Sequence, residues 1–283
     1  MPLSTIDRYK YLTWAIVEHR HPLDTSCPAC QSSETRFMRR KYVATSLREC
    51  QRCWLRFRVP KDDDTTAFYQ KAYSEGFGTN LPTDSTLKRL LETRFRDTEK
   101  DFFPYIELIR SQGLSSGDVV VDFGASWGYG SWQMQQAGFD VYSYEISLPR
   151  ARFAREKLGC KVIDSLSALP GKAQCLFSAH VIEHLPDPNV IWTSGKAILE
   201  HGGFIACFCP NGNPETEDVV GLGTYDQLWG KVHPLLITPR FLQSASARHG
   251  FDSDLSSSPY QVEHSDLHGS ELCLIARRHG YSA

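Results

Sequence analysis

The segment VVVDFGASWGYGSW, residues 119–132, constrains the fold of this chain more than any other. Three consecutive valines from Val119 form a short β-branched run, typical of a strand that is covered on both faces. Asp122 ends the run, and Gly124 and Gly128 allow turn conformations and a close backbone approach that a Cβ atom would hinder. We therefore predict a buried strand that passes through a glycine-rich turn into a helix, where a backbone loop can cradle a nucleotide.

A second strand is predicted over residues 139–146, FDVYSYEI, where apolar and polar side chains alternate. It ends at Glu145, about 20 residues beyond the first strand, where a carboxylate can accept hydrogen bonds from both hydroxyls of a ribose. From Gly124 the glycine spacing is G-x-x-x-G-x-G. A dinucleotide-dependent oxidoreductase would instead carry G-x-G-x-x-G, so the spacing argues against that class.

These motifs resemble those of the class I S-adenosylmethionine (SAM)-dependent methyltransferases, whose first motif reads acidic-x-Gly-x-Gly-x-Gly. Asp122, Gly124 and Gly128 match it, and Ser126 stands where the middle glycine is usual. Further matches follow at Asp164, at residues 178–188 and at residues 202–211. The resemblance implies that SAM is the cofactor, bound by Asp122, Gly124, Ala125, Ser126, Gly128, Glu145, Asp164, Ser165 and Ala179.

In this family a segment before the first strand commonly lies across the bound cofactor. Tyr69 and Tyr73 are therefore further candidates to contact it. Packing in the core of a helical segment is an equally good interpretation of both side chains.

The cysteines divide into two groups. Two CxxC pairs, Cys27/Cys30 and Cys50/Cys53, are separated by 19 residues, a spacing typical of a zinc ribbon. Four thiolates would close the coordination shell, so such a zinc is structural. A redox-active pair is the alternative for either CxxC alone. The other five cysteines fall in or beside predicted strands, where a free cysteine behaves as a small hydrophobic residue.

Strands and helices alternate along the second half of the chain. Strands are predicted at 119–122, 140–145, 161–163, 175–179, 203–208, 251–259 and 271–277, and helices at 129–137, 149–158, 189–200 and 238–248. The alternation predicts an α/β fold, a Rossmann-like doubly wound seven-stranded sheet. We expect a zinc-ribbon domain over residues 1–64, a helical cap or linker over 65–115 and a SAM-dependent methyltransferase domain over 116–283.

Histidine and carboxylate residues follow the predicted fourth strand. His180, Glu183 and His184 come directly after it, and His233 lies in a long segment without a clear helix or strand pattern. The set resembles the divalent-metal sites of the ubiquinone-biosynthesis O-methyltransferases and the small-RNA 2′-O-methyltransferases, although His180 replaces their first glutamate. That replacement favours zinc, manganese or iron over magnesium. The alternatives are a general base, His180 or His233, and a loop-fixing role without catalysis.

Composition bears on partners and location. The net charge of 283 residues is only −2, which argues against broad nucleic-acid binding. Between Arg36 and Lys61, however, nine Arg or Lys face one acidic residue, Glu49, a local excess of eight. This basic ribbon is either a solvated surface or a docking face for an anionic carrier. The sequence contains no run long enough for a membrane span and no apolar signal core at its start, so we expect a cytoplasmic protein.

Together these features predict a SAM-dependent methyltransferase with a small-molecule acceptor. The added ribbon resembles that of methyltransferases from glycan and natural-product pathways, which implies a sugar or glycan-related hydroxyl. One alternative is an RNA methyltransferase that docks its substrate on the basic ribbon. Another is a SAM-binding interaction module without catalysis.

Overall fold

A computed structural model describes residues 23–41, 45–61, 80–213, 221–257 and 271–278, with four isolated helical positions at residues 9, 13, 216 and 218. Its main element is a seven-stranded sheet in the order β10-β11-β8-β7-β4-β5-β6. The strands are β4 (Val119–Phe123), β5 (Asp140–Tyr144), β6 (Lys161–Ile163), β7 (Ala173–Ala179), β8 (Leu199–Pro210), β10 (Phe251–Ser257) and β11 (Glu271–Arg278). β11 runs antiparallel to both of its neighbours, and the other pairs are parallel. The predicted doubly wound sheet is confirmed.

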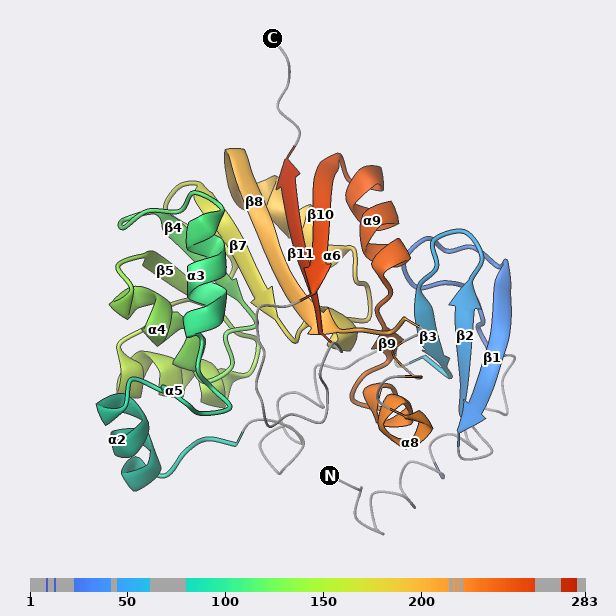
Figure 1. Ribbon diagram of the computed structural model, residues 1–283, viewed down its shortest axis with the longest axis horizontal. Coiled ribbons are helices and arrows are strands. Elements are labelled where there is room, and N and C mark those ends of the chain that lie inside the picture. The colour runs from blue at the N-terminus through green and yellow to red at the C-terminus, as the bar shows by residue number, and fades with distance from the viewer. Residues whose placement is uncertain are drawn as a thin grey trace.

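Helices cover both faces of this sheet (Figure 1). They are α3 (Phe103–Ser111), α4 (Tyr129–Gln136), α5 (Leu148–Leu158), α6 (Val190–Ile198) and α9 (Pro239–Arg248), with short 3-10 turns η2 (Leu166–Ala168) and η3 (Ile182–His184). A further helix, α2 (Asp84–Glu92), packs on α5. Val120 and Phe177 pack in one cluster with α3 and α4. Val121 and Leu176 pack in another with α6 and α9. This period of two is what a strand covered on both faces requires. Among the described helices, none is long and apolar enough to cross a membrane.

The ribbon forms a second, antiparallel sheet beside α9 (Figure 1). Its strands are β1 (Thr35–Lys41), β2 (Thr45–Cys50), β3 (Arg56–Val59) and β9 (Leu235–Leu236). β9 comes from the segment after β8 and pairs with β3. Leu55 and Phe57 belong to the same hydrophobic cluster as α6 and α9. The ribbon and the large sheet therefore share one core.

The long segment after β8, which showed no clear pattern in the sequence, contains two short helical pieces, α8 (Leu222–Tyr225) and η4 (Asp226–Leu228). Tyr225 is 1% exposed. Its hydroxyl donates to the Gly212 carbonyl (2.9 Å) and accepts from Arg56 Nη1 (2.7 Å). The Lys41 ammonium donates to the Trp229 carbonyl at 2.9 Å. These contacts fasten the segment to the ribbon.

Candidate active site

The glycine-rich turn follows β4 at the point where the strand order reverses, since β4 pairs with β5 on one side and with β7 on the other. Ligands of open α/β sheets bind beyond the strand ends at such a switch point. Gly124 has a φ of 84° and Gly128 a φ of 86°. A Cβ at Gly124 would overlap the Val181 side chain, and one at Gly128 would lie 2.7 Å from Ala154 Cβ. Both positions therefore require glycine.

Ser126, at the position of the usual middle glycine, has a φ of 52°. That left-handed conformation costs a residue with a Cβ roughly 1–2 kcal/mol. Its backbone N–H donates to Glu145 Oε2 at 2.8 Å, and its hydroxyl accepts from Arg150 Nη1 at 3.1 Å. A hydrogen bond to a charged group is worth about 1.5–3 kcal/mol, enough to offset the strain. The turn thus keeps a glycine-like path without the glycine.

Glu145 faces this turn from the end of β5. Its second oxygen accepts the Ser147 N–H at 2.7 Å. Burial raises the pKa of Glu145, although hydrogen bonds from the backbone and the charge of Arg150 oppose that rise. A carboxylate offers about four acceptor positions, so two remain for hydroxyl groups of a ligand.

Asp122 lies inside the protein and is 4% exposed. Its carboxylate accepts from the Ser131 hydroxyl at 2.6 Å, and that hydroxyl accepts from Ser143 at 2.7 Å. Burial raises the pKa of Asp122 to about 7. The hydrogen bond from Ser131 opposes this rise, and the charge of Glu145 adds to it. Asp122 therefore ties β4 to α4 and β5 beneath the turn.

The remaining predicted cofactor residues have varied surroundings. Ala125 is buried in the turn and its N–H lies 3.2 Å from the Tyr144 carbonyl. Asp164 follows β6 and is 93% exposed, with Arg155 at 3.6 Å. Ser165 Oγ lies 2.9 Å from Ser167 Oγ, and Ala179 ends β7. Tyr69 and Tyr73 lie outside the described residues.

A cluster of three side chains comes next, at the same edge of the sheet. Donor atoms of Glu183, His184 and His233 all lie within 4.8 Å of one another. Glu183 is 2% exposed. Within the described part of the chain, neither of its carboxylate oxygens has a hydrogen-bond partner. A buried carboxylate without hydrogen bonds is costly unless a cation satisfies it.

The tautomer of His184 also fits a metal ligand. Its Nδ1 lies 2.7 Å from the Val232 carbonyl, so Nδ1 carries the proton and Nε2 keeps its lone pair. That lone pair lies 4.0 Å from Glu183 Oε1, which leaves two acceptors facing each other. Burial lowers the pKa of His184. Burial and the neighbouring charge of His184 lower the pKa of His233 to about 4. Both rings are then neutral at pH 7, the form that binds metals.

His180 pairs both with Glu183 of this cluster and with a residue far along the chain. Its Nε2 lies 2.7 Å from Glu271 Oε1, and its Nδ1 lies 3.6 Å from Glu183 Oε1. Tyr105 donates to the same Glu271 oxygen at 2.8 Å. Burial works to lower the pKa of His180, but the two carboxylates outweigh it and raise that pKa to about 10. His180 is therefore an imidazolium, a hydrogen-bond donor that cannot accept a proton.

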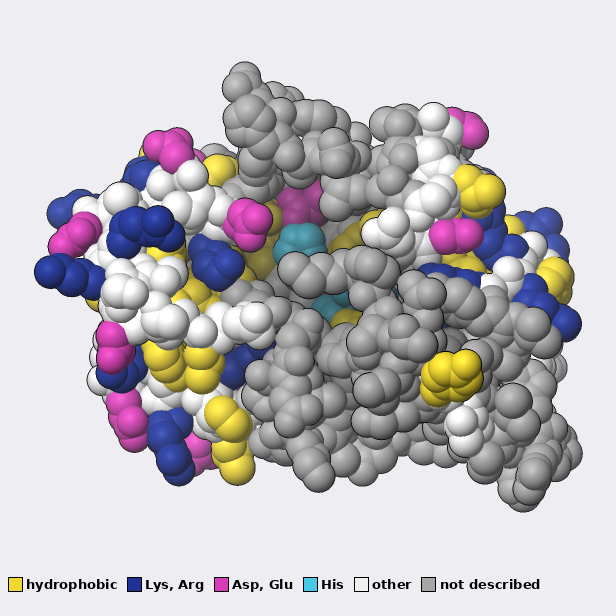
Figure 2. All heavy atoms as spheres, turned by 90° about the horizontal axis from the view of Figure 1, so that it is seen from below, with side chains coloured by type: hydrophobic (Ala, Val, Ile, Leu, Met, Phe, Trp, Pro, Cys, Tyr) yellow, Lys and Arg dark blue, Asp and Glu magenta, His cyan; other side chains and the backbone are white. Residues whose placement is uncertain are grey.

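Histidine and acidic side chains lie together in a hollow of the face that Figure 2 shows. Glu271 was not predicted as part of this site. It opens β11 opposite Pro210 of β8, and the His180 N–H donates to the Phe208 carbonyl near the end of that strand. Glu271 reaches His180 through the antiparallel pairing of β11 with β8, and no local sequence motif predicts this contact.

The four ribbon cysteines also form a cluster. The sulfurs of Cys27 and Cys53 and those of Cys30 and Cys50 are 3.5 Å apart in each pair, and all four lie within 4.8 Å. Tetrahedral zinc with bonds of about 2.3 Å separates its sulfurs by about 3.8 Å. The cluster therefore has dimensions that suit zinc. The other five cysteines are buried.

Most of the basic ribbon residues contact groups inside the protein. Arg36 and Arg56 both pair with Glu49, and Arg39 pairs with Asp226. Arg48 donates to Thr35, and Lys61 contacts Asp24 and Ser26. Asp226 and Asp24 thus offset two of the eight excess positive charges of this segment.

Comparison with known proteins finds relatives of part of this chain. No family model matches the chain. Over 144 residues it is 29% identical to a ubiquinone biosynthesis O-methyltransferase of Bordetella avium, which covers 44% of this chain and 60% of that protein. Over 106 residues it is 32% identical to an uncharacterized methyltransferase of Geobacillus sp.. The match covers 35% of this chain and 48% of that protein. The chain thus spans only about half to three-fifths of these relatives' lengths.

One solved structure superposes on most of this chain. Magnesium protoporphyrin IX methyltransferase from Synechocystis with bound SAH superposes with a TM-score of 0.51 at 14% identity, covering 76% of this chain and 98% of that one. The fold is that of the class I methyltransferases. Within this fold, the glycine-rich turn and the histidine–carboxylate cluster lie at the edge where an α/β sheet binds its ligands.

Proposed function

We propose that the protein is a SAM-dependent methyltransferase that methylates a hydroxyl group of a small polar acceptor. One observation carries the proposal: the cofactor-type turn and the histidine–carboxylate cluster meet at the switch point. Val181, between His180 and Glu183, packs so closely on Gly124 that a Cβ there would overlap it. A donor held at the turn and an acceptor held at the cluster would lie next to each other, and such alignment is the main requirement of methyl transfer.

In this proposal the turn and Glu145 hold SAM. The two free acceptor positions of Glu145 receive the ribose hydroxyls, while Ser126 and Ser147 keep the carboxylate in place. Asp164 and Ser165 follow β6, Ala179 ends β7, and all three complete the cofactor side because these parallel strands end at the same edge.

The cluster of Glu183, His184 and His233 would hold a divalent ion. Two imidazoles and one carboxylate suit zinc, manganese or iron better than magnesium. Such an ion would lower the pKa of an acceptor hydroxyl and orient it. His233, held neutral by burial, is the general base if the cluster works without an ion. His180, positively charged between Glu183 and Glu271, holds these two carboxylates in place beside the acceptor.

The acceptor we infer is a sugar or a glycan-related molecule. His180, whose side chain is half exposed, and Glu271 beside it are charged groups that can pair with a polyhydroxylated ligand. The relative from Bordetella avium is named as an O-methyltransferase, which supports oxygen as the methylated atom. The ribbon, in turn, would hold one structural zinc through its four cysteines.

Calorimetry with SAM and SAH tests the cofactor site. Glu145→Ala should weaken SAM binding by about 1.5–3 kcal/mol, roughly 10- to 150-fold, because it removes the charged acceptor of the ribose. Glu156→Ala, which removes an exposed carboxylate from α5, serves as the matched control. Unchanged SAM affinity in folded Glu145→Ala protein would refute the ribose assignment. SAM binding without methyl transfer to any sugar or phenolic acceptor would favour the non-catalytic module.

Manganese titration followed by electron paramagnetic resonance tests the second metal. The wild-type protein should bind one Mn²⁺ in addition to the ribbon zinc, and Glu183→Gln should abolish that binding. Glu92→Gln, at a 64% exposed position, should leave it unchanged. Equal Mn²⁺ binding by Glu183→Gln, or methyl transfer that resists chelation while zinc is retained, would exclude the ion and leave His233 as the base.

A further inference from the structure

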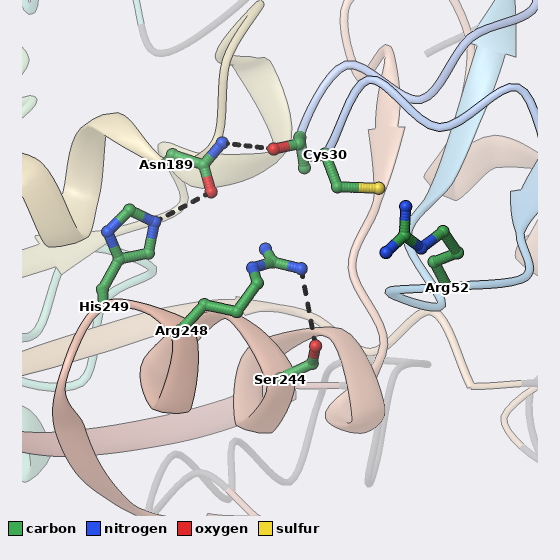
Figure 3. A pocket seen from close by; sticks show the side chains of 7 residues that line it. Cys30, Arg52, Asn189, Ser244, Arg248 and His249 are labelled. Atoms are coloured by element: carbon green, nitrogen blue, oxygen red, sulfur yellow. Dashed lines mark hydrogen bonds between the residues drawn. The ribbon is translucent and has the colours of Figure 1, made fainter.

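A pocket separate from the active-site cluster lies between the ribbon and the helices α6 and α9 (Figure 3). Its volume is about 520 Å³, within the range of small-ligand sites. The residues that line it are Ala29, Cys30, Arg52, Asn189, Ser244, Arg248 and His249. None of them is acidic. The ribbon and the helices α6 and α9 thus form an open basic pocket between them.

Two guanidinium groups extend into this pocket from opposite walls. Arg52 comes from the second cysteine knuckle and Arg248 from the end of α9, and Figure 3 shows both pointing into the same space. Arg248 Nη1 has only a long contact of 3.5 Å to Ser244 Oγ. Among the described residues, neither guanidinium pairs with a carboxylate. Two like charges that face one space without a counter-ion repel each other, and a bound anion would relieve that repulsion.

The wall between the two arginines is rigid. Asn189 donates to the Ala29 carbonyl at 2.7 Å, and its side-chain oxygen lies 3.1 Å from His249 Nε2. The His249 ring stacks on Trp192 at an angle of 12°. The nearby Asp187 carboxylate is engaged by the backbone and side-chain N–H groups of Asn189. These contacts hold the wall of the pocket in place.

The surroundings of the pocket are electropositive. Helix α6 begins directly after Asn189, and the N-terminus of a helix carries a partial positive charge. Burial lowers the pKa of His249, and the charges of Lys196 and Arg248 add to the effect. The charges of Lys196 and Arg248 and the helix end favour an anion at this place, and the charge of Asp187 opposes it.

We propose that this pocket binds a phosphate or diphosphate group. Guanidinium groups form paired hydrogen bonds with phosphate oxygens, and two of them match a ligand with two or more negative charges. The volume exceeds what one phosphate needs, so a nucleoside diphosphate fits as well as free phosphate. This binding does not depend on the proposed methyl transfer.

Calorimetry with UDP, inorganic phosphate and uridine at constant ionic strength tests the proposal. UDP should bind, and uridine, which has no phosphate, should not. Phosphate binding as tight as UDP binding would make free phosphate the ligand, while tighter UDP binding would make it a nucleotide; either supports the site. Arg52→Gln and Arg248→Gln should each weaken binding at least tenfold. Arg240→Gln removes one charge from the same helix outside the pocket and should have no such effect.

Two results would overturn the proposal. One is the absence of binding by both UDP and phosphate at millimolar concentration. The other is an equal loss of affinity in the Arg240→Gln control and in the two pocket variants, because that would reflect net charge rather than a site. Circular dichroism and zinc content of each variant would show that the ribbon remains folded.

Discussion

Replacing Asp122 by asparagine should make the protein more stable at neutral pH and less sensitive to pH. The carboxylate is 4% exposed, and its pKa rises from 3.8 to about 7 in the folded protein, chiefly because burial disfavours the charge. The folded state therefore holds a proton that the unfolded chain releases above pH 3.8. The contribution of this group to the free energy of unfolding is therefore fully present below pH 3.8 and is lost as the pH rises toward 7.

The size of the effect follows from the shift. About three pKa units at 1.36 kcal/mol each correspond to about 4 kcal/mol between the two limits. Between pH 5 and 8 the wild-type free energy of unfolding should fall by about 2.5 kcal/mol through this group. The D122N side chain keeps a carbonyl oxygen that accepts from Ser131, so its curve should lack that fall.

Urea unfolding at four pH values between 5 and 8, followed by tryptophan fluorescence without SAM, measures the difference. Asp84→Asn, at a position 85% exposed, is the control and should leave the pH dependence unchanged, since surface ion pairs contribute at most about 1 kcal/mol. Parallel curves for the wild-type protein and D122N would show that Asp122 is already ionised in the folded protein and would refute the reasoning.

Two further predictions concern the attachment of the ribbon. Tyr225→Phe removes a hydroxyl that accepts from Arg56 and donates to Gly212, while the direct bond from Arg56 to the Gly212 carbonyl (3.1 Å) remains. It should lower the free energy of unfolding by about 1–3 kcal/mol, because a buried guanidinium loses one of its acceptors; unchanged urea unfolding would contradict this. Cys50→Ser should reduce zinc content, measured by elemental analysis, and lower the melting temperature of the whole protein, since the ribbon shares a core with α6 and α9. Cys160→Ser should retain zinc, and an unchanged melting temperature in zinc-free Cys50→Ser protein would mean that the ribbon folds independently.

The large sheet could be predicted from the sequence because its signals are local. Every strand and helix predicted from residue 119 onward is present, since β-branched runs, glycine turns and amphipathic periods each act over a few residues. The two CxxC pairs likewise predicted a cluster that the structure brings within 4.8 Å.

The missed features depend on contacts between distant residues. A two-residue strand such as β9 carries no periodic pattern, so its pairing with β3 could not be foreseen. Glu271 reaches His180 only through the antiparallel β11. For the same reason the sequence left His180 open as a base, whereas the carboxylates on both sides of its ring make it an imidazolium. The pairing of Arg39 with Asp226 likewise joins residues far apart in the sequence, and no local pattern predicts it.

A crystal structure of the protein grown with SAH and Mn²⁺, with anomalous data collected at the manganese edge, tests the central claim most directly. The account predicts SAH along the glycine-rich turn with its ribose on Glu145, and an anomalous peak between Glu183, His184 and His233. SAH bound elsewhere, or a turn that remains empty at saturating SAH, would contradict the assignment of this edge as a methyltransferase site.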